Sequence, residues 1–275
     1  MKRFLRGIAC ALCLLCIGAS GFAQETIRIA TGEYPPFLSE ELKYHGVGIR
    51  VITEAFALEG VRVEYGWFPW KRAYELMKSG AWDCTGTWRK TPDREKDGYF
   101  SDPLYPTAFT FFHRKDFRFD WKSMDDLGGL FIGATIGYGY GQAFGDAEKW
   151  GSINVERVPT DLQNFRKLLA GRIHLFPINP DVGYDLLSQG FTPQEAELIT
   201  HHPRPLLSAH TNLVFSRKVE RNRRMVILFN RGLKQLRESG KIAQYFRESR
   251  QGEYHKGIVA NGAEGNMPIP IPSTP

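Results

Sequence analysis

The chain has 275 residues, of which 42% are hydrophobic and 24% are charged. This composition is typical of a folded globular protein and excludes a disordered chain, a collagen-like repeat and a small disulfide scaffold. The 36 basic and 30 acidic residues give a formal charge of +6. Because this surplus is mild and comes with no recognisable nucleic-acid-binding motif, we expect no nucleic-acid partner.

The first 23 residues have the layout of a secretory signal peptide. Three basic residues near the start precede an apolar stretch at residues 8–17, and mostly small residues follow up to Ala23. The apolar stretch is too short to span a bilayer. A buried N-terminal helix is the alternative. We therefore predict an exported, periplasmic protein that loses residues 1–23.

Removal of this segment would leave one cysteine of the four, Cys84. A single thiol cannot form an internal disulfide. We expect Cys84 to be a buried apolar residue rather than a nucleophile.

Strand-like and helix-like patterns alternate from residue 26 onward. Strand patterns cover residues 26–30, 61–67 and 83–87, and helical patterns cover residues 48–58 and 70–78. This βαβαβ order predicts one α/β layer.

A second alternating unit begins after residue 125. Its predicted elements are a strand at 131–134, a helix at 141–148, a strand at 153–158, a helix at 161–170, a strand at 173–176, a helix at 181–187 and a strand at 196–200. Two α/β units of this kind predict a chain of two lobes.

Apolar, strand-like segments flank the second unit at residues 109–113 and 212–215. A chain that leaves the first lobe on one segment and returns on the other would form a two-stranded hinge. Helices at 219–236 and 242–248 would then complete the first lobe, and the residues from Ser249 on are typical of a mobile tail. The expected division is a signal peptide at 1–23, lobe 1 at 24–108 with 212–248, lobe 2 at 109–211, and a tail at 249–275.

A series of short motifs extends over nearly the whole mature chain. The motifs are ATGEYPPF at residues 30–37, GVGI at 46–49, LMKSGAWD at 76–83, TPDR at 91–94, FSDPLY at 100–105, SMDDL at 123–127, AGRIH at 170–174 and SGKIAQYF at 239–246. In their order and spacing these motifs resemble the solute-binding protein family 3 of ABC importers, the polar amino-acid-binding type.

The resemblance implies a type II periplasmic-binding fold, in which each lobe is a central mixed β-sheet flanked by helices. A two-stranded hinge would join the lobes, and a small ligand would bind in the cleft between them. It further implies a monomer that delivers its ligand to a membrane ABC permease, with no cofactor and no metal.

Arg94 is the residue that the resemblance assigns to the ligand carboxylate. In the family, the arginine of the Thr-Pro-acid-Arg motif binds that carboxylate through a guanidinium fork, which a lysine cannot provide. The alternative is a surface arginine that lies beside Asp93 and Glu95.

Backbone donors for the same anion would come from both lobes. On the first lobe the implied loop contains Thr85 and Thr87, and on the second it contains Gly137 and Tyr138, in a glycine-rich run that precedes a helix. Read alone, the second loop could be an ordinary turn.

Aromatic walls for the ligand side chain are implied at Tyr34 and Trp70, with Trp88 as a third candidate. Aromatic side chains give a pocket a large contact area at a small entropy cost. Packing in the core is the alternative for each of them.

The sequence departs from the family pattern where most relatives carry the carboxylate that binds the ligand amino group. Asn179 stands at that position, and either Asp181 or Glu33 could replace it, although Asp181 also fits a helix N-cap and Glu33 a rim residue. Arg89 is a further departure; if it faced the ligand, the site would favour a dicarboxylate or another organic anion. His174, where relatives are acidic, is expected to be structural.

The sequence therefore predicts a binding protein for a small polar ligand, an amino acid or a related carboxylate, and no enzyme. One alternative is an enzyme on the same fold, such as a cyclohexadienyl dehydratase, for which Glu33, Asp181 and His174 are the available acids. The other is a ligand sensor that docks on a membrane receptor. The sequence leaves open the identity of the ligand and the choice between transport and sensing.

Overall fold

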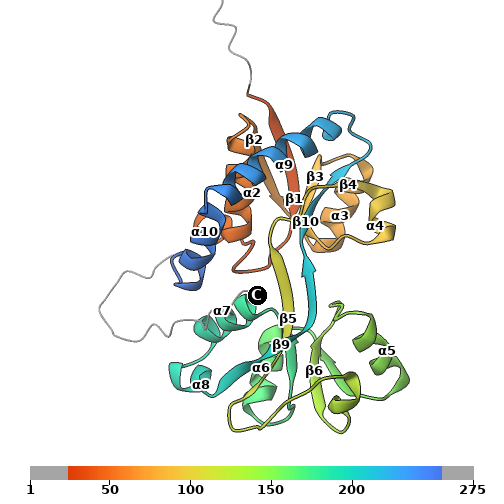
Figure 1. Cartoon of the computed structure of the whole chain (residues 1–275), viewed down its shortest axis with the longest axis vertical. Helices are drawn as coiled ribbons and strands as arrows, with labels where there is room; N and C mark the ends of the chain where they lie inside the picture. The colour runs from red at the N-terminus through yellow and green to blue at the C-terminus, as the bar shows by residue number, and fades with distance from the viewer. Residues whose placement is uncertain (1–23, 256–275) are drawn as a thin grey trace, which may run out of the picture.

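The computed structural model describes residues 24–255, which form two lobes, each made of β-strands covered by helices (Figure 1). The predicted signal peptide at 1–23 and the end of the predicted tail at 256–275 lie outside the described residues. Within 24–255, no helix has the length and apolar character needed to cross a membrane.

Lobe 1 is built on a five-stranded mixed sheet. Its strands are β1 (Thr26–Thr31), β2 (Arg62–Trp67), β3 (Cys84–Trp88), β4 (Gly98–Phe100) and β10 (Asn212–Ser216), in the order β2-β1-β3-β10-β4. β1 pairs in parallel with β2 and β3, whereas β10 pairs antiparallel with β3 and β4. The C-terminal part of the chain thus returns to complete the sheet that the N-terminal part begins.

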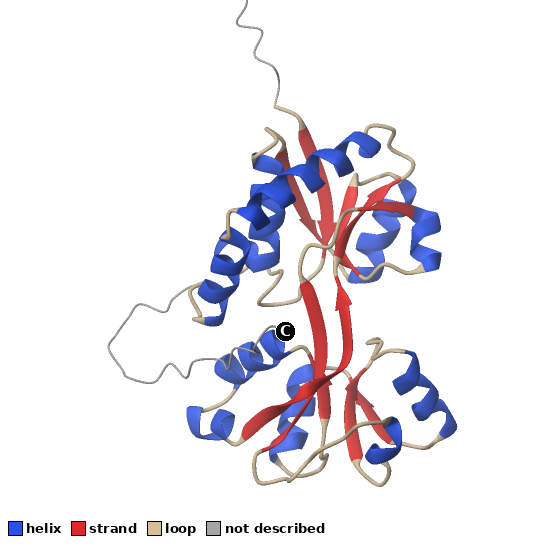
Figure 2. Cartoon of the chain, in the orientation of Figure 1, coloured by secondary structure: helices blue, strands red, loops and turns tan. Residues whose placement is uncertain are grey.

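Helices cover both faces of this sheet (Figure 2). They are the 3-10 turn η1 (Lys43–His45) and the helices α2 (Val47–Ala57), α3 (Trp70–Ser79), α4 (Pro92–Asp97), α9 (Asn222–Glu238) and α10 (Lys241–Arg250). α9 packs closely on α2 because residue 232 is glycine: a Cβ there would lie 1.9 Å from the carbonyl oxygen of Ala55. Phe56 of α2 meets Phe229 of α9 with ring centroids 4.9 Å apart.

Lobe 2 has two groups of strands. β8 (Phe176–Ile178), β5 (Pro106–Arg114) and β9 (Ile199–His210) form an antiparallel sheet in that order, and β6 (Phe131–Thr135) pairs in parallel with β7 (Asn154–Val158). A bridge between Ile132 and Leu175 joins the two groups. The helical elements are η2 (Met124–Leu127), α5 (Gln142–Trp150), α6 (Asp161–Leu169), α7 (Pro180–Gly190) and α8 (Pro193–Glu197).

The connection between the lobes is two-stranded, as expected, but the segment at 212–215 is not the partner of 109–113. β5 pairs instead with β9, from Pro106 opposite His210 to Arg114 opposite Ile199, while β10 belongs to the lobe 1 sheet. The sequence of β9 contains two prolines, which lack the N–H that a central strand needs; β9 lies at the edge of its sheet, where proline is tolerated.

Two further boundaries are corrected in lobe 2. The strand predicted at 196–200 is preceded by helix α8, whose N-cap Thr192 and third helical residue Glu195 form a reciprocal capping box, and the strand begins at Ile199. The strand predicted at 173–176 begins at Phe176, although Leu175 already bridges to β6.

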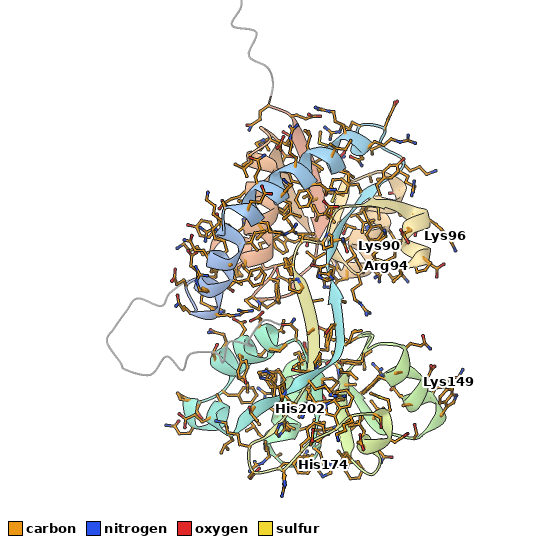
Figure 3. All side chains as sticks on the ribbon, in the orientation of Figure 1. Lys90, Arg94, Lys96, Lys149, His174 and His202 are labelled. Carbon is orange, nitrogen blue, oxygen red and sulfur yellow. The ribbon has the colours of Figure 1, made fainter. Side chains whose placement is uncertain are left out.

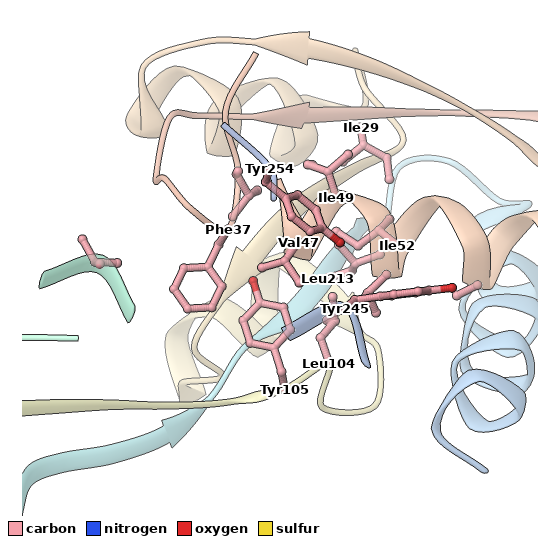
Figure 4. Packing of buried hydrophobic residues seen from close by; sticks show 14 of the residues in the cluster. Ile29, Phe37, Val47, Ile49, Ile52, Leu104, Tyr105, Leu213, Tyr245 and Tyr254 are labelled. Carbon is pink, nitrogen blue, oxygen red and sulfur yellow. The ribbon is translucent and has the colours of Figure 1, made fainter. Parts of the chain in front are cut away.

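The predicted tail from Ser249 is also corrected, because the chain stays packed to residue 255. Ser249 lies within α10, and Tyr254 is 1% exposed in the lobe 1 core, beside Ile49 and Tyr245 (Figure 4). The Arg50 guanidinium donates to the Tyr254 hydroxyl at 2.8 Å. These contacts explain why a segment without regular structure is ordered here.

Candidate functional site

The first turn of α4 positions Arg94 at the edge of lobe 1 that faces lobe 2 (Figure 3). Thr91 is the N-cap of this helix and its hydroxyl accepts from the Arg94 backbone N–H at 3.4 Å, while Pro92 fixes the first helical position. The side chain turns back: its Nη1 donates to the carbonyl oxygen of Arg89 at 2.9 Å, and its Cζ lies 4.7 Å from the Trp88 ring centroid. Arg94 is thereby half-buried.

Arg94 has no carboxylate partner within residues 24–255. Its two acidic neighbours are engaged by lysines, since Asp93 pairs with Lys96 at 2.8 Å and Glu95 pairs with Lys90 at 2.8 Å. Burial, together with the like charge of Arg89, holds the pKa of Arg94 below its ordinary value. These contacts argue against the alternative in which Arg94 is a surface arginine paired with Asp93 or Glu95.

The Trp88 ring that contacts this guanidinium belongs to an aromatic cluster. The Trp88 ring meets Trp70 edge to face, with centroids 5.4 Å apart, and meets Tyr74 at 5.0 Å. The Trp70 indole donates to the Glu33 carbonyl oxygen at 3.2 Å, and it comes so close to the chain at Gly32 that a Cβ there would lie 2.8 Å from the ring. Trp70, Trp88 and Arg94 therefore form one continuous group.

Tyr34 lies on the loop after β1. Its ring stacks on Phe37 with centroids 5.7 Å apart. Burial raises the pKa of the Tyr34 hydroxyl well above its ordinary value, and the Tyr138 hydroxyl and the Asp161 carboxylate of lobe 2 raise it further. Tyr34 is thus close enough to feel the charge of groups on the opposite lobe.

The two threonines of β3 differ in exposure. Thr85 is fully buried, and its hydroxyl accepts from the Trp88 indole N–H at 3.1 Å, so it fixes the Trp88 ring. Thr87 is half-buried beside Trp88 on the same strand.

The predicted loop of lobe 2 lies between β6 and α5. Gly137 has φ +84° and Gly141, the N-cap of α5, has φ +98°, a backbone conformation that glycine adopts without strain. Arg89 Nη2 donates to the Gly139 carbonyl oxygen at 3.5 Å, a contact between the two lobes. The structure thus brings Arg89 and this loop together, as part of the surface that the lobes share.

Asp161 is a residue of this region that the sequence analysis missed. It follows the N-cap Thr160 at the start of α6, and its carboxylate accepts from the Thr135 hydroxyl and, at 3.2 Å, from the Tyr138 hydroxyl. Burial raises the pKa of Asp161 above its ordinary value. In the sequence, Pro-Thr-Asp before a helical pattern indicates only a helix start, and the folded chain is needed to show that this carboxylate contacts Thr135 and Tyr138.

Asn179, Asp181 and Glu33 are engaged within the protein. Asn179, not Asp181, is the N-cap of α7: its Oδ1 accepts from the Asp181 and Val182 backbone N–H groups, and its Nδ2 donates to the Thr107 hydroxyl at 3.0 Å. Glu33 is exposed and accepts from the backbone N–H of Glu40.

Asp181 pairs with Arg250 of α10, whose Nε donates at 2.7 Å and whose Nη2 donates at 3.2 Å. This ion pair argues against Asp181 as a ligand anchor. His174 has the structural role expected of it, since its Nδ1 accepts from the Phe131 N–H at 2.9 Å and its ring stacks on Phe131. The thiol of Cys84 is fully buried, as expected, and burial raises its pKa.

A sequence profile of bacterial extracellular solute-binding proteins, family 3, matches residues 27–248. The chain belongs to this family. The family 3 fold accounts for the two lobes, the mixed sheet of lobe 1 and the return of β10 into that sheet. A search of curated proteins found no match.

Solved structures share the fold at low sequence identity. An ancestral arginine-binding protein bound to arginine is 21% identical with a TM-score of 0.63, over 81% of this chain and 97% of that one. The ancestral amino acid-binding protein AncCDT-1, a precursor of cyclohexadienyl dehydratase, is 20% identical with a TM-score of 0.59, over 81% and 94%. A histidine kinase sensor domain with similarity to periplasmic binding proteins is 17% identical with a TM-score of 0.64, over 81% and 95%.

Proposed function

We propose that this family 3 protein is a periplasmic binding protein that captures a small carboxylate-bearing ligand between its lobes and delivers it to an ABC permease. One observation carries the proposal: the half-buried Arg94 has no carboxylate partner within residues 24–255, and its acidic neighbours are held by lysines. A buried charge without a partner is costly, and a guanidinium fork matches a carboxylate in shape and charge. The ligand would supply the missing anion.

Trp70, Trp88 and Tyr34 support a ligand with an apolar part. The Trp88 ring contacts the Arg94 guanidinium, Trp70 packs against Trp88, and Tyr34 lies on the loop after β1 in the same lobe. A ligand whose carboxylate binds Arg94 would therefore place its side chain against flat rings, which provide contact area at a small entropy cost.

Closure of the lobes would follow from the same contacts. β5 and the segment from β9 to β10 connect the lobes, and Arg89 already reaches Gly139 across the gap. A ligand that contacts both lobes shifts the population toward the closed arrangement by the difference between its affinities for the two states.

Thermal-shift measurements on refolded, ligand-stripped protein test this proposal. The probes are the common L-amino acids, polyamines, dicarboxylates and aromatic acids. A ligand at about 100 times its Kd stabilises the folded state by about 2.7 kcal/mol, which is a rise of roughly 5–10 °C for a protein of this size.

Two arginine variants make the result specific. We expect Arg94→Ala to lose the response to a carboxylate ligand, and Arg62→Ala, which removes an exposed arginine paired with Glu64, to keep it. An unchanged response in Arg94→Ala would overturn the carboxylate assignment, and consumption of an aromatic acid during the incubation would favour the enzyme alternative.

A further inference from the structure

We propose that residues 250–255 form a strap that ties helix α7 of lobe 2 to lobe 1 and holds the two lobes in the arrangement seen here. The strap would set the balance between lobe arrangements before any ligand binds. This inference goes beyond the proposed function, because it concerns the protein without a ligand.

Two ion pairs connect the strap to lobe 2. Arg250 Nε donates to the Asp181 carboxylate at 2.7 Å, and His255 Nε2 donates to the Asp185 carboxylate at 2.6 Å. Asp181 and Asp185 are four residues apart in α7, so their side chains lie on the same face of the helix. Among the ion pairs within residues 24–255, these two are the ones that join the lobes.

The strap itself is fixed on lobe 1. The Tyr254 side chain is buried in the lobe 1 core, and its hydroxyl accepts from the Arg50 guanidinium at 2.8 Å. The Tyr254 carbonyl oxygen accepts from the Lys43 backbone N–H, also at 2.8 Å. Because these contacts hold the strap in place, a movement of α7 away from lobe 1 must break the two ion pairs.

Both ion pairs are largely shielded from water. The side chains of Arg250 and Asp181 are 28% and 17% exposed, and those of His255 and Asp185 are 14% and 11% exposed. Partly buried pairs are screened by salt less than exposed pairs, and removal of one member leaves a partly buried charge without a partner. The two pairs therefore favour the arrangement in which α7 lies against lobe 1.

The strap is separate from the candidate site. In the common view of Figures 1 and 3, α7 and α10 meet on one side of the strands that connect the lobes, and Arg94 lies on the other side. The match to the family profile ends at residue 248, so Arg250 and His255 also lie beyond the region on which family membership rests.

The strap would affect ligand binding without contacting the ligand. A ligand shifts the lobes only by the difference between its affinities for their arrangements. The free energy of the two ion pairs adds to that difference for a ligand that prefers this arrangement, and subtracts from it for a ligand that needs another.

The distance between the lobes in the absence of ligand tests the inference. Nitroxide labels at Ala243→Cys on α10 and Gln194→Cys on α8 would report it by double electron–electron resonance, since both positions are exposed and lie on the strap side of the molecule (Figure 1). Cys84, the single cysteine expected in the mature protein, is fully buried and should stay unlabelled.

Asp181→Asn combined with Asp185→Asn removes both charges and keeps the side-chain shapes. We expect a second, longer distance whose population relative to the original one is at least about fivefold higher than in the unaltered protein, because each ion pair contributes modestly and two are lost. Asp116→Asn combined with Glu156→Gln is the matched control. It breaks two ion pairs inside lobe 2 and should leave the distances unchanged.

The same two pairs can be broken from lobe 1. Arg250→Gln combined with His255→Gln should give the same longer distance, and it decides the question if the α7 variant does not fold. An unaltered distance distribution in a folded variant that lacks both pairs would overturn the inference. No ligand enters the measurement, so this result leaves the proposed function standing, whereas unchanged ligand binding by Arg94→Ala would overturn that function and leave the strap.

Discussion

Gly232→Ala tests the packing that holds α9 on lobe 1. The added Cβ would lie 1.9 Å from the carbonyl oxygen of Ala55 and 2.8 Å from its carbonyl carbon. Both are backbone atoms of α2, so no side chain can rotate away. The two helices must separate by about 1 Å, and the fully buried Phe56 and Phe229 rings between them would lose contact.

The expected cost follows from two opposing effects. Overpacking against a backbone costs about 3 kcal/mol, and the better helix propensity of alanine returns about 1 kcal/mol. The net loss of about 2 kcal/mol in the free energy of unfolding corresponds to a fall in Tm of roughly 4–8 °C.

Gly145→Ala is the matched control. This glycine also lies inside a helix, α5, but it is exposed and its Cβ would meet nothing within 4 Å. The same substitution should therefore stabilise the protein by about 0.5–1 kcal/mol. Circular dichroism melting of both variants measures the two changes in Tm, which should be a fall for Gly232→Ala and a rise for Gly145→Ala. A Gly232→Ala variant as stable as the unaltered protein would refute the packing of α2 on α9 described here.

Three further measurements follow from buried or paired groups. Burial lowers the pKa of His113 and of His201. Their contribution to stability is therefore full above about pH 6.5 and falls as the pH drops below that value. In urea titrations, the stability of His201→Gln minus that of the unaltered protein should be more favourable at pH 5.5 than at pH 7.5. A hydrogen bond to Asp185 at 2.6 Å raises the pKa of His255, so His255→Ala should cost more stability at pH 5.5 than at pH 8.5, and an equal cost at both values would contradict this pairing. Cys84 is fully buried and should react with a thiol reagent such as iodoacetamide only as fast as the protein unfolds; rapid reaction of the folded protein would show that the thiol is accessible.

The alternating strands and helices of each lobe could be predicted from periodicity. The strand patterns at 26–30 and 61–67 correspond closely to β1 (Thr26–Thr31) and β2 (Arg62–Trp67), because buried strands and amphipathic helices leave local signals. Most of β9 could not be predicted in this way, because prolines interrupt its strand pattern. Its pairing with β5 is what defines it as an edge strand.

The candidate site, like the fold, could be predicted from the sequence only in part. Arg94 stands in a motif that can be recognised locally, and Thr91 and Pro92 form its helix start. The engagement of Asp181 could not be foreseen, because its partner Arg250 is 69 residues away in the chain. Asp161 escaped notice for a related reason: it differs from an ordinary helix-start acid only through its tertiary contacts with Thr135 and Tyr138.

The central claim is that a ligand carboxylate binds Arg94 between the lobes. Isothermal titration with an amino acid that stabilises the protein, and then with the carboxamide of that amino acid, tests it most directly, since the two ligands differ only at the group that Arg94 would bind. The account predicts that the carboxamide binds at least about 30-fold more weakly, as expected when one member of a buried charge pair is neutralised. Equal affinity for the two ligands would contradict the account.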